Sequence, residues 1–322
     1  MPHLSRPTMR CLDDIVRAVQ SAPDKTRVAI APCAEGFVLR AGLAAAQKGL
    51  AVPVFIGNRA KSLELAQARG LDLSAHEFID CPDDAEAVTR AVELFRAGGA
   101  QLIMKGLVST STVLKAVLNK EAGLVPEGGI LSHVSVFDAP GRELGLGGLM
   151  LLTDAGVNIR PTLQRKVEIL RNALATARAL GLETPRAAML AATEKVNYPA
   201  MPATLDADMI AKMAEQGEFG SALVAGPLAL DLAVSPQAAA LKGVSHPVAG
   251  HADILCTPDI ESGNILYKTL SCLMNITMAS VVVGSRIPVV VPSRGDSEHT
   301  KLASIALAAY LAHQARNEEG AL

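Results

Sequence analysis

The sequence predicts an α/β protein with two domains, each built on a mainly parallel sheet flanked by helices. Short runs rich in Val, Ile and Leu alternate with longer segments rich in Ala and Leu. Runs that are apolar throughout are typical of strands buried on both faces, and the longer segments are typical of helices that link parallel strands. With 322 residues, of which 50% are hydrophobic, the chain is long enough for two domains of ordinary size.

Ten short apolar runs are the candidate strands. In chain order they span residues 27–32, 51–57, 102–106, 133–139, 148–154, 186–192, 222–227, 252–258, 279–284 and 289–293. Three segments between them have apolar residues at three- and four-residue spacing and a glycine near the end, which predicts helices. These helices span residues 37–50, 84–98 and 161–181.

The Gly- and Pro-rich stretch 123–133 is the best candidate for a crossing between domains. The last strand and helix can belong with the first domain, which makes the second domain an insertion. We therefore expect a first domain of residues 1–130 plus 284–322 and a second domain of residues 131–283.

Charge and composition argue against nucleic-acid and membrane partners. The 30 Lys and Arg nearly balance 32 Asp and Glu, only 3% of residues are aromatic, and there is no Trp. The N-terminus lacks the uninterrupted apolar segment of a signal peptide, and the longest uncharged run, 269–285, is interrupted by polar residues and short for a membrane span. We expect a cytoplasmic protein whose partners are small molecules.

The stretch from Met104 to Leu118, MKGLVSTSTVLKAVL, places four hydroxyl residues between two lysines where a strand gives way to a helix. Free N–H groups at a helix start, hydroxyl donors and ammonium groups together favour an anion, most naturally phosphate. The competing interpretation is a simple helix cap with solvated lysines. No Walker pattern is present, so nucleoside triphosphate hydrolysis is not supported. The candidate phosphate ligands are Lys105, Ser109, Thr110, Ser111, Thr112 and Lys115.

A second stretch, PSRGDS, follows the last apolar run and precedes an Ala-rich helix. The guanidinium of Arg294 can hold a phosphate or a developing oxyanion through two hydrogen bonds, and the Ser293 hydroxyl can donate to the same centre. The competing interpretation is again a capped helix, with Asp296 or Ser297 as the cap and Arg294 on the surface.

Several polar residues stand in apolar surroundings, where they form either a structural network or a pocket. They are Asp154, Asn158, Asp231, Asp259, Glu261, Asn264 and Lys268. His133, and His246 and His251 with Asp253, invite a metal interpretation, but their spacing matches no strong ligand signature and we expect no metal. The five scattered cysteines (Cys11, Cys33, Cys81, Cys256 and Cys272) contain no C-x-x-C pair, which favours reduced thiols over a disulfide or zinc framework.

Taken together, the sequence motifs of this chain resemble those of the phosphate acetyl/butyryltransferase family, and the phosphate butyryltransferase branch looks closest. The resemblance runs from VFIGN at residues 54–58 to the C-terminus. The matching motifs are MKGLVSTST, LSHVSVF, LLTDAGVNIRPTLQRK, TEKVNYPAMPATLDA, GPLALDLA, GHADILCTPDIESGNILYK and PSRGDS. It implies two α/β domains around a cleft, similar to the isocitrate and isopropylmalate dehydrogenases, with the second domain inserted into the first.

The resemblance implies reversible transfer of a short acyl group, butyryl or acetyl, between coenzyme A and phosphate, without a metal, a permanent cofactor or an obligatory acyl-enzyme. It assigns catalysis to Ser293 and Arg294, and it implies a homodimer formed through the second domain. The coenzyme A and acyl side is expected on that domain, at His133, Asp154, Asn158, Gly226, Pro227, Asn264 and Lys268.

Two positions depart from the acetyl-specific relatives. Lys115 stands where they have an arginine, which keeps the charge but loses the two-pronged donor. Thr300 stands where they have an aspartate that acts as the base for the coenzyme A thiol, and a thiol with a pKa near 8.5 needs activation at neutral pH. Asp296, Glu298 and His299 are near in sequence, and bound phosphate is another candidate for the role.

Two other classes of function remain open. One is a binding module for phosphate or coenzyme A that has lost turnover, which ligand stabilisation without thiol release would reveal. The other is a metal- and NAD-dependent dehydrogenase on the related fold, which needs carboxylates such as Asp154, Asp231 and Asp259 to converge on one divalent ion.

Overall fold

The computed structural model describes residues 8–139 and 148–319, and its contacts group the chain into two compact units. The main unit comprises Asp13–Leu131 and the chain from Ala279 onward; the inserted unit comprises Ser132–Met278 with residues 8–12. The division at residues 130 and 284 stays a prediction about domains. The contact grouping divides the chain between residues 131 and 132 and between residues 278 and 279, and it assigns residues 8–12 to the inserted unit.

The main unit has a mostly parallel sheet in the strand order β3-β2-β1-β4-β11-β10. Among the described strands of this unit, only the β10–β11 pair, joined at Val282 and Val289, is antiparallel. The middle strands are fully buried, with Ile30, Ile103 and Met104 at 0% exposure. The strands are β1 (Arg27–Ala31), β2 (Val52–Gly57), β3 (Glu77–Asp80), β4 (Leu102–Lys105), β10 (Ala279–Val283) and β11 (Val289–Val290).

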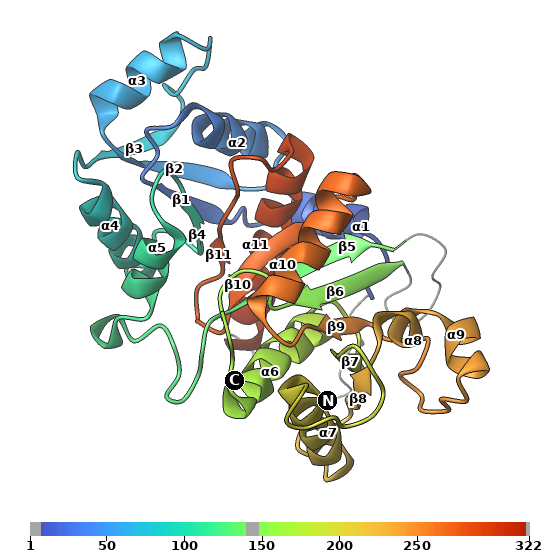
Figure 1. The fold of residues 1–322 in the computed structure, drawn as a ribbon. Coiled ribbons are helices and arrows are strands. Elements are labelled where there is room, and N and C mark those ends of the chain that lie inside the picture. The colour runs from blue at the N-terminus through green and yellow to red at the C-terminus, as the bar shows by residue number, and fades with distance from the viewer. Residues whose placement is uncertain (1–7, 140–147, 320–322) are drawn as a thin grey trace. The chain divides into compact units, whose positions relative to one another are not determined.

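Helices cover both faces of this sheet, with α4 and α5 on one side and α2 and α11 on the other (Figure 1). Side chains cap several of them: Asn58, Asp83 and Ser109 each accept a hydrogen bond from a backbone N–H in the first turn. The helices are α1 (Leu12–Ser21), α2 (Gly36–Gln47), α3 (Arg59–Gln67), α4 (Asp84–Arg96), α5 (Thr110–Val117), the 3₁₀ turn η1 (Lys120–Ala122) and α11 (Glu298–Glu319).

The inserted unit has its own strand order, β5-β6-β9-β7-β8, in which β5 and β6 pair antiparallel and the others pair parallel. Helix α10 packs on β6, α8 packs on β7, and α6 and α7 contact each other. The strands are β5 (Ser132–Asp138), β6 (Leu149–Thr153), β7 (Arg186–Leu190), β8 (Leu223–Leu228) and β9 (Ile254–Cys256). The helices are α6 (Leu163–Ala179), α7 (Pro202–Glu215), α8 (Leu230–Val234), α9 (Pro236–Leu241), α10 (Ile260–Lys268) and the π-helical turn η2 (Thr269–Leu273).

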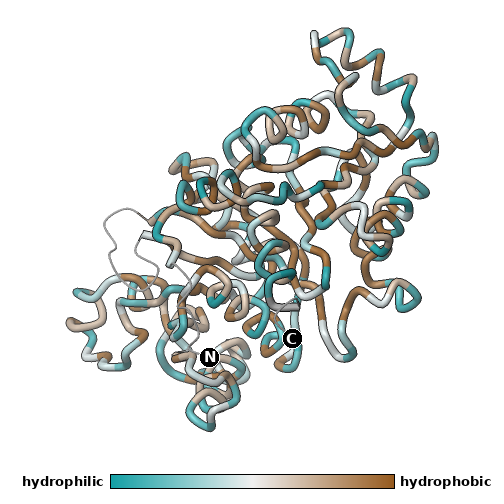
Figure 2. Tube along the Cα trace, turned by 180° about the vertical axis from the view of Figure 1, so that it is seen from behind, coloured by the Kyte–Doolittle hydropathy of each residue, from teal (hydrophilic) through white to brown (hydrophobic). Residues whose placement is uncertain are grey.

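The predicted α/β class is confirmed, and a strand lies within or beside each of the ten predicted runs. Strand β3 was not predicted, because Glu77–Asp80 is short, carries an acidic residue at each end and lies at the sheet edge. Figure 2 shows hydrophobic colour concentrated along the strands and hydrophilic colour along much of the helices, as the sequence pattern implies. Within the described ranges, no helix has both the length and the apolar character needed to cross a bilayer.

Candidate functional site

Three neighbouring strands of the main unit end at one edge of its sheet. Strands β1, β4 and β11 are parallel neighbours, with Ala31 opposite Lys105 and Val290 opposite Met104. The loops that follow these strands therefore start side by side. Carboxyl ends of parallel strands are where open α/β sheets place their ligands, and both predicted phosphate-binding stretches follow strands of this set.

The loop after β4 is held by its own lysine and by a glycine. Lys105 Nζ donates hydrogen bonds to the carbonyl oxygens of Gly106 at 3.2 Å and Val108 at 3.0 Å. A Cβ atom on Gly106 would lie 1.7 Å from the carbonyl oxygen of Pro32 in the loop after β1, so only glycine fits here. The half-buried ammonium of Lys105 thus stays anchored at the strand end.

Three of the four hydroxyl residues, Ser109, Ser111 and Thr112, form one hydrogen-bonded cluster at the start of α5. Ser109 Oγ caps the helix by accepting from Thr112 N at 3.1 Å, and it lies 2.7 Å from Ser111 Oγ and 2.9 Å from Thr112 Oγ1. Thr110 begins the helix, and Lys115 lies exposed in its last turn. Ser111 and Lys115 are one turn apart and share a face of α5. The cap interpretation is correct for Ser109, and further hydroxyls remain beside it.

The loop after β11 is a turn closed by an acidic side chain. Ser293 N donates to Asp296 Oδ2 at 2.7 Å, and Asp296 N donates to Ser293 O at 3.2 Å. Ser297 caps α11, since its Oγ accepts from Thr300 N at 3.1 Å. Ser293 and Arg294 are therefore exposed on a defined turn directly before a helix start.

The charges of the two loops interact. Burial, and next the nearby Arg294 guanidinium, lower the pKa of the Lys105 ammonium from its usual 10.5. A cation whose pKa is lowered by a second cation marks a place where positive charge is concentrated, which favours an anion. Among the predicted site residues of the main unit, the fold thus brings Lys105 and Arg294 within electrostatic reach of each other.

Thr300 faces inward. It is 5% exposed, and its Oγ1 accepts a hydrogen bond from Ser297 Oγ at 3.2 Å. Its neighbour Lys301 donates to the Asp296 carbonyl and lies 5.2 Å from the centre of the Phe37 ring. Thr300 therefore supports the first turn of α11.

Sequence reasoning missed the loop after β1. Cys33 N donates to Ile56 O at 2.8 Å, burial raises the pKa of its thiol to about 11, and Glu35 caps α2 through a 3.1 Å bond from Gly36 N. Beside this loop, Glu35, Phe37, Arg40, Arg69, Glu298 and Lys301 help line a cavity of about 350 Å³. The available signal was its position: PCAEGF follows a buried strand, as the other two loops do.

In the inserted unit, Asp154 organises the loop that follows β6. It is 3% exposed; Oδ1 accepts from Gly156 N at 2.8 Å and Val157 N at 2.9 Å. Oδ2 accepts from Asn158 Nδ2 at 2.7 Å and from Asn158 N at 3.3 Å. Four donors on one carboxylate make Asp154 and Asn158 a structural network, one of the two interpretations that the sequence left open.

Asn264 and His133 lie beside the same loop, and Lys268 lies next to the ring that contacts His133. Asn264 Nδ2 donates to Ala155 O at 3.2 Å, and Thr153 Oγ1 donates to His133 O at 2.9 Å. The His133 ring meets the Tyr267 ring edge-on, with centroids 6.0 Å apart, and Lys268 Nζ lies 5.0 Å from the centre of the Tyr267 ring.

Gly226 and Pro227 lie apart from this cluster, on strand β8 at the sheet edge. A Cβ atom on Gly226 would lie 2.6 Å from Met189 Cβ and 3.1 Å from Ala207 Cβ, so Gly226 makes room for close packing. Neither residue is among those that line the apolar pocket of this unit.

That pocket has a volume of about 590 Å³ and opens at the ends of β7 and β9. Thr257, on its wall, donates to the Asp154 carbonyl at 3.3 Å, which ties the pocket to the Asp154 loop. Its other walls are formed by Leu190, Ala191, Ala192, Met201, Pro202, Ala203, Thr204, Leu230, Pro258, Ser262, Ile265, Leu266 and Thr269.

Two of the histidine and carboxylate candidates for a metal accept hydrogen bonds from protein groups. Asp253 is buried and accepts two hydrogen bonds from the Arg186 guanidinium, at 3.0 and 3.1 Å. His246 Nδ1 accepts from Val248 N at 3.2 Å. Within residues 8–139 and 148–319, no group of three or more His, Cys, Asp or Glu is placed to hold a metal ion.

Comparisons with known proteins show the family of this chain. Residues 84–309 match the model of the family described as Phosphate acetyl/butaryl transferase. The chain is 41% identical over 304 residues to a Phosphate butyryltransferase of Clostridium acetobutylicum, covering 94% of this chain and 99% of the relative. It is 38% identical over 304 residues to a Phosphate acetyltransferase of Rhizobium meliloti, covering 94% of each.

Among solved structures, the chain resembles a branched-chain phosphotransacylase from Enterococcus faecalis V583. The TM-score is 0.78 at 35% identity, covering 89% of this chain and 99% of that one. On the strength of the family match and of relatives that align along nearly their whole length, this chain belongs to the phosphate acetyl/butyryltransferase family.

Proposed function

We propose that the protein transfers a short-chain acyl group reversibly between coenzyme A and inorganic phosphate. The observation that carries this proposal is the convergence of Lys105 and Arg294 at adjacent strand ends. The hydroxyl cluster at the start of α5 follows the same strand as Lys105. Family membership supplies the reaction class, and this edge of the main unit supplies the donors that a phosphate nucleophile requires.

In the reaction, a phosphate oxygen attacks the carbonyl carbon of the thioester. The C–O bond forms, the C–S bond breaks, and the coenzyme A sulfur leaves with the electron pair as thiolate, which takes up a proton. In the reverse direction the thiolate attacks the acyl phosphate and phosphate leaves. Negative charge develops on the carbonyl oxygen in between, so fixed donors aimed at that oxygen lower the barrier.

We assign phosphate binding to Lys105, Lys115 and the hydroxyls of residues 109–112. A phosphate at this place takes hydrogen bonds from backbone N–H groups at the start of α5 and from the exposed hydroxyls. We assign charge stabilisation in the transition state to Arg294, assisted by the Ser293 hydroxyl. Both are held on the turn that Asp296 closes.

Thr300 is not a candidate for the base that accepts the thiol proton, because its buried hydroxyl is engaged with Ser297 and lacks basicity. Asp154 is also a poor candidate, since its two oxygens already accept four hydrogen bonds. The bound phosphate itself has a pKa near neutrality, and we assign the proton to it. This assignment needs no further side chain.

We place the coenzyme A and acyl side on the inserted unit, as the family resemblance implies. The apolar pocket of about 590 Å³ suits an acyl chain or the apolar part of the coenzyme A arm. Asn264 and Lys268 lie on α10, the helix whose Ile265 and Leu266 line that pocket, and they supply polar groups for amides or phosphates. Coenzyme A acts as a substrate in this proposal, and no permanent cofactor is required.

A homodimer is part of the proposal. Ile265, Leu273 and Met274 are 68%, 79% and 61% exposed and lie on or just after α10 and η2 of the inserted unit. Large apolar side chains that cluster on a surface favour burial against a second copy. Light scattering tests this, and we expect the mass of a dimer.

We further propose that the protein acts in the cytoplasm, where acyl-CoA and phosphate are both available.

The proposed function is tested by phosphate-dependent release of coenzyme A thiol from butyryl-CoA and acetyl-CoA. We expect release with at least one of these thioesters and none when sulfate replaces phosphate. Lys61→Gln removes an exposed charge of α3 outside the proposed site and should release thiol as the wild type does. Binding of coenzyme A without any release would point to a module that has lost turnover.

A further inference from the structure

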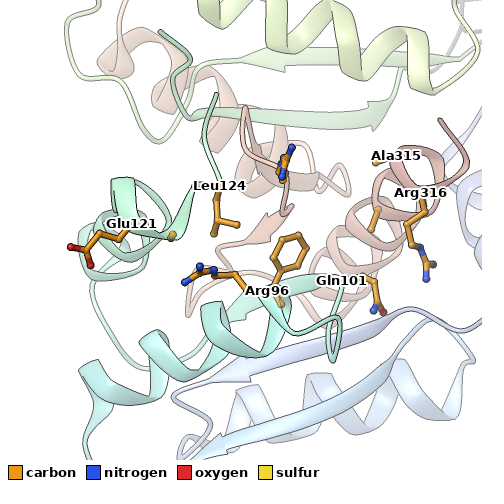
Figure 3. A pocket seen from close by; sticks show the side chains of 11 residues that line it. Arg96, Gln101, Glu121, Leu124, Ala315 and Arg316 are labelled. Atoms are coloured by element: carbon orange, nitrogen blue, oxygen red, sulfur yellow. The ribbon is translucent and has the colours of Figure 1, made fainter. Parts of the chain in front are cut away.

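A second basic site lies at the other edge of the main-unit sheet. Gln101 directly precedes β4, and Arg286 lies in the turn before β11, so both mark the amino ends of these parallel strands. Helices α4 and α11 bring Arg96 and Arg316 to the same edge, near their own carboxyl ends. Together they line a cavity of about 500 Å³, shown in Figure 3.

The charges in this cavity are unbalanced. Its lining contains three arginines, Arg96, Arg286 and Arg316, against one acidic residue, Glu121. Figure 3 shows Glu121 and Arg316 at opposite ends of the cavity. Within the described part of the chain, no hydrogen bond or ion pair joins any of the three guanidinium groups to a partner.

Arg316 is the most informative of the three. Its Nε and Nη2 atoms are shielded from solvent and have no hydrogen-bond partner among the described residues. A buried guanidinium nitrogen without a partner is costly, so such an atom calls for a water, an ion or a ligand that completes it. Two hydrogen bonds hold residues of the cavity lining: Arg286 N donates to Leu124 O at 2.8 Å, and Gln101 Oε1 accepts from Arg27 N at 2.8 Å.

The walls indicate an organic ligand. Phe95, Leu124 and Ala312 contribute apolar surface beside the arginines. Guanidinium groups bind phosphate oxygens through paired hydrogen bonds, and a volume of this size fits a molecule as large as a nucleotide. We propose that this cavity binds a nucleotide-sized organic phosphate at a site separate from the acyl-transfer site.

Helix α11 separates the two sites. It begins beside the Ser293–Asp296 turn and reaches Arg316 near its other end, and its 22 residues span about 33 Å at 1.5 Å per residue. One ligand of nucleotide size cannot reach both ends of such a helix. The cavity is therefore independent of phosphate binding at Lys105 and Arg294, and it does not rest on the proposed function.

The test is calorimetric titration of ADP, as the probe, into the wild type and four single variants. Arg286→Gln and Arg316→Gln each remove one guanidinium from the cavity, and we expect each to weaken ADP binding at least about tenfold. Lys61→Gln removes an equal charge elsewhere on the main unit, and Arg294→Gln removes the cation of the acyl-transfer site. We expect both of these to bind ADP as the wild type does.

Thiol release is measured on the same proteins. Arg286→Gln and Arg316→Gln are expected to keep wild-type rates without ADP, which separates the cavity from the chemistry; circular dichroism verifies that they fold. The proposal is overturned if the wild type binds no ADP at millimolar concentration, or if Arg294→Gln abolishes binding while the two cavity variants retain it. Binding of ADP by a protein that releases no thiol would refute the acyl-transfer proposal alone.

Discussion

Burial, and next the Arg294 guanidinium, lower the pKa of the Lys105 ammonium across two strand ends that lie side by side in the main unit. The two residues are far apart in sequence, and each is held by its own loop: Lys105 by two carbonyl oxygens, and Arg294 by the turn that Asp296 closes. Two cations held close together without an anion repel each other, and a bound phosphate relieves that repulsion.

Replacing Arg294 should slow the chemistry. We expect Arg294→Ala to lower kcat by at least about tenfold, because it removes charge stabilisation developed in the transition state. Arg294→Lys should recover only part of the loss, since an ammonium lacks the two-pronged donor. Steady-state kinetics with varied butyryl-CoA and phosphate separates kcat from KM. An unchanged kcat in Arg294→Ala would place the reaction elsewhere.

Lys105 should leave a signature in the pH dependence of stability. Its folded-state pKa lies below its usual 10.5, so in the interval between the two values the unfolded chain holds more protons than the folded one. The free energy of unfolding therefore gains a contribution that rises with pH across that interval. Lys105→Met removes it, whereas Lys61→Met should not. Urea unfolding at several alkaline pH values, compared between each variant and wild type, measures the difference, and parallel curves would refute the assignment.

The close approach of the loops after β1 and β4 can be tested by substituting Gly106. A Cβ atom on Gly106 would lie 1.7 Å from Pro32 O, so we expect Gly106→Ala to destabilise the protein by at least about 2 kcal/mol. A Cβ atom on Gly295, in the loop after β11, would meet no other atom within 4 Å, and Gly295→Ala should change stability by no more than about 0.5 kcal/mol. Equal effects of the two substitutions in urea unfolding would contradict this account.

Asp154 should matter for stability. An amide in its place can keep one oxygen toward Gly156 N and Val157 N, but its NH2 group then faces the N–H donors of Asn158, so Asp154→Asn should cost about 3 kcal/mol. The control is Asp208→Asn, which breaks a Lys212 pair within one helix and should cost about 0.5 kcal/mol or less. Thermal unfolding compares them. A neutral Asp154→Asn that is inactive would instead make Asp154 a catalytic group.

Local signals in the sequence predicted much of the main unit and two of the three loops at its candidate site. The apolar runs predicted the strands, and the run of hydroxyl residues at 109–112 predicted a helix start, because both follow from nearest neighbours along the chain. The strand register that pairs Val290 with Met104 joins segments that are distant in sequence, and residue spacing along the chain does not predict it. For that reason only the fold shows that Lys105 and Arg294 lie near each other.

Other features depend on side-chain direction, which the sequence does not specify. Asp154 stood out as a polar residue among apolar ones, but only the fold shows that its oxygens face its own loop. Thr300 differs from the expected acid in type, and the fold adds that its hydroxyl faces Ser297. The cavity at Arg316 draws its residues from several separate segments, so no local pattern could reveal it.

The most direct test of the central claim is thiol release from butyryl-CoA by purified protein, measured with phosphate, with sulfate and with Arg294→Ala. We predict release that requires phosphate, yields butyryl phosphate in equal amount, and falls at least about tenfold in the variant. Absence of release above background with phosphate and either butyryl-CoA or acetyl-CoA would contradict it.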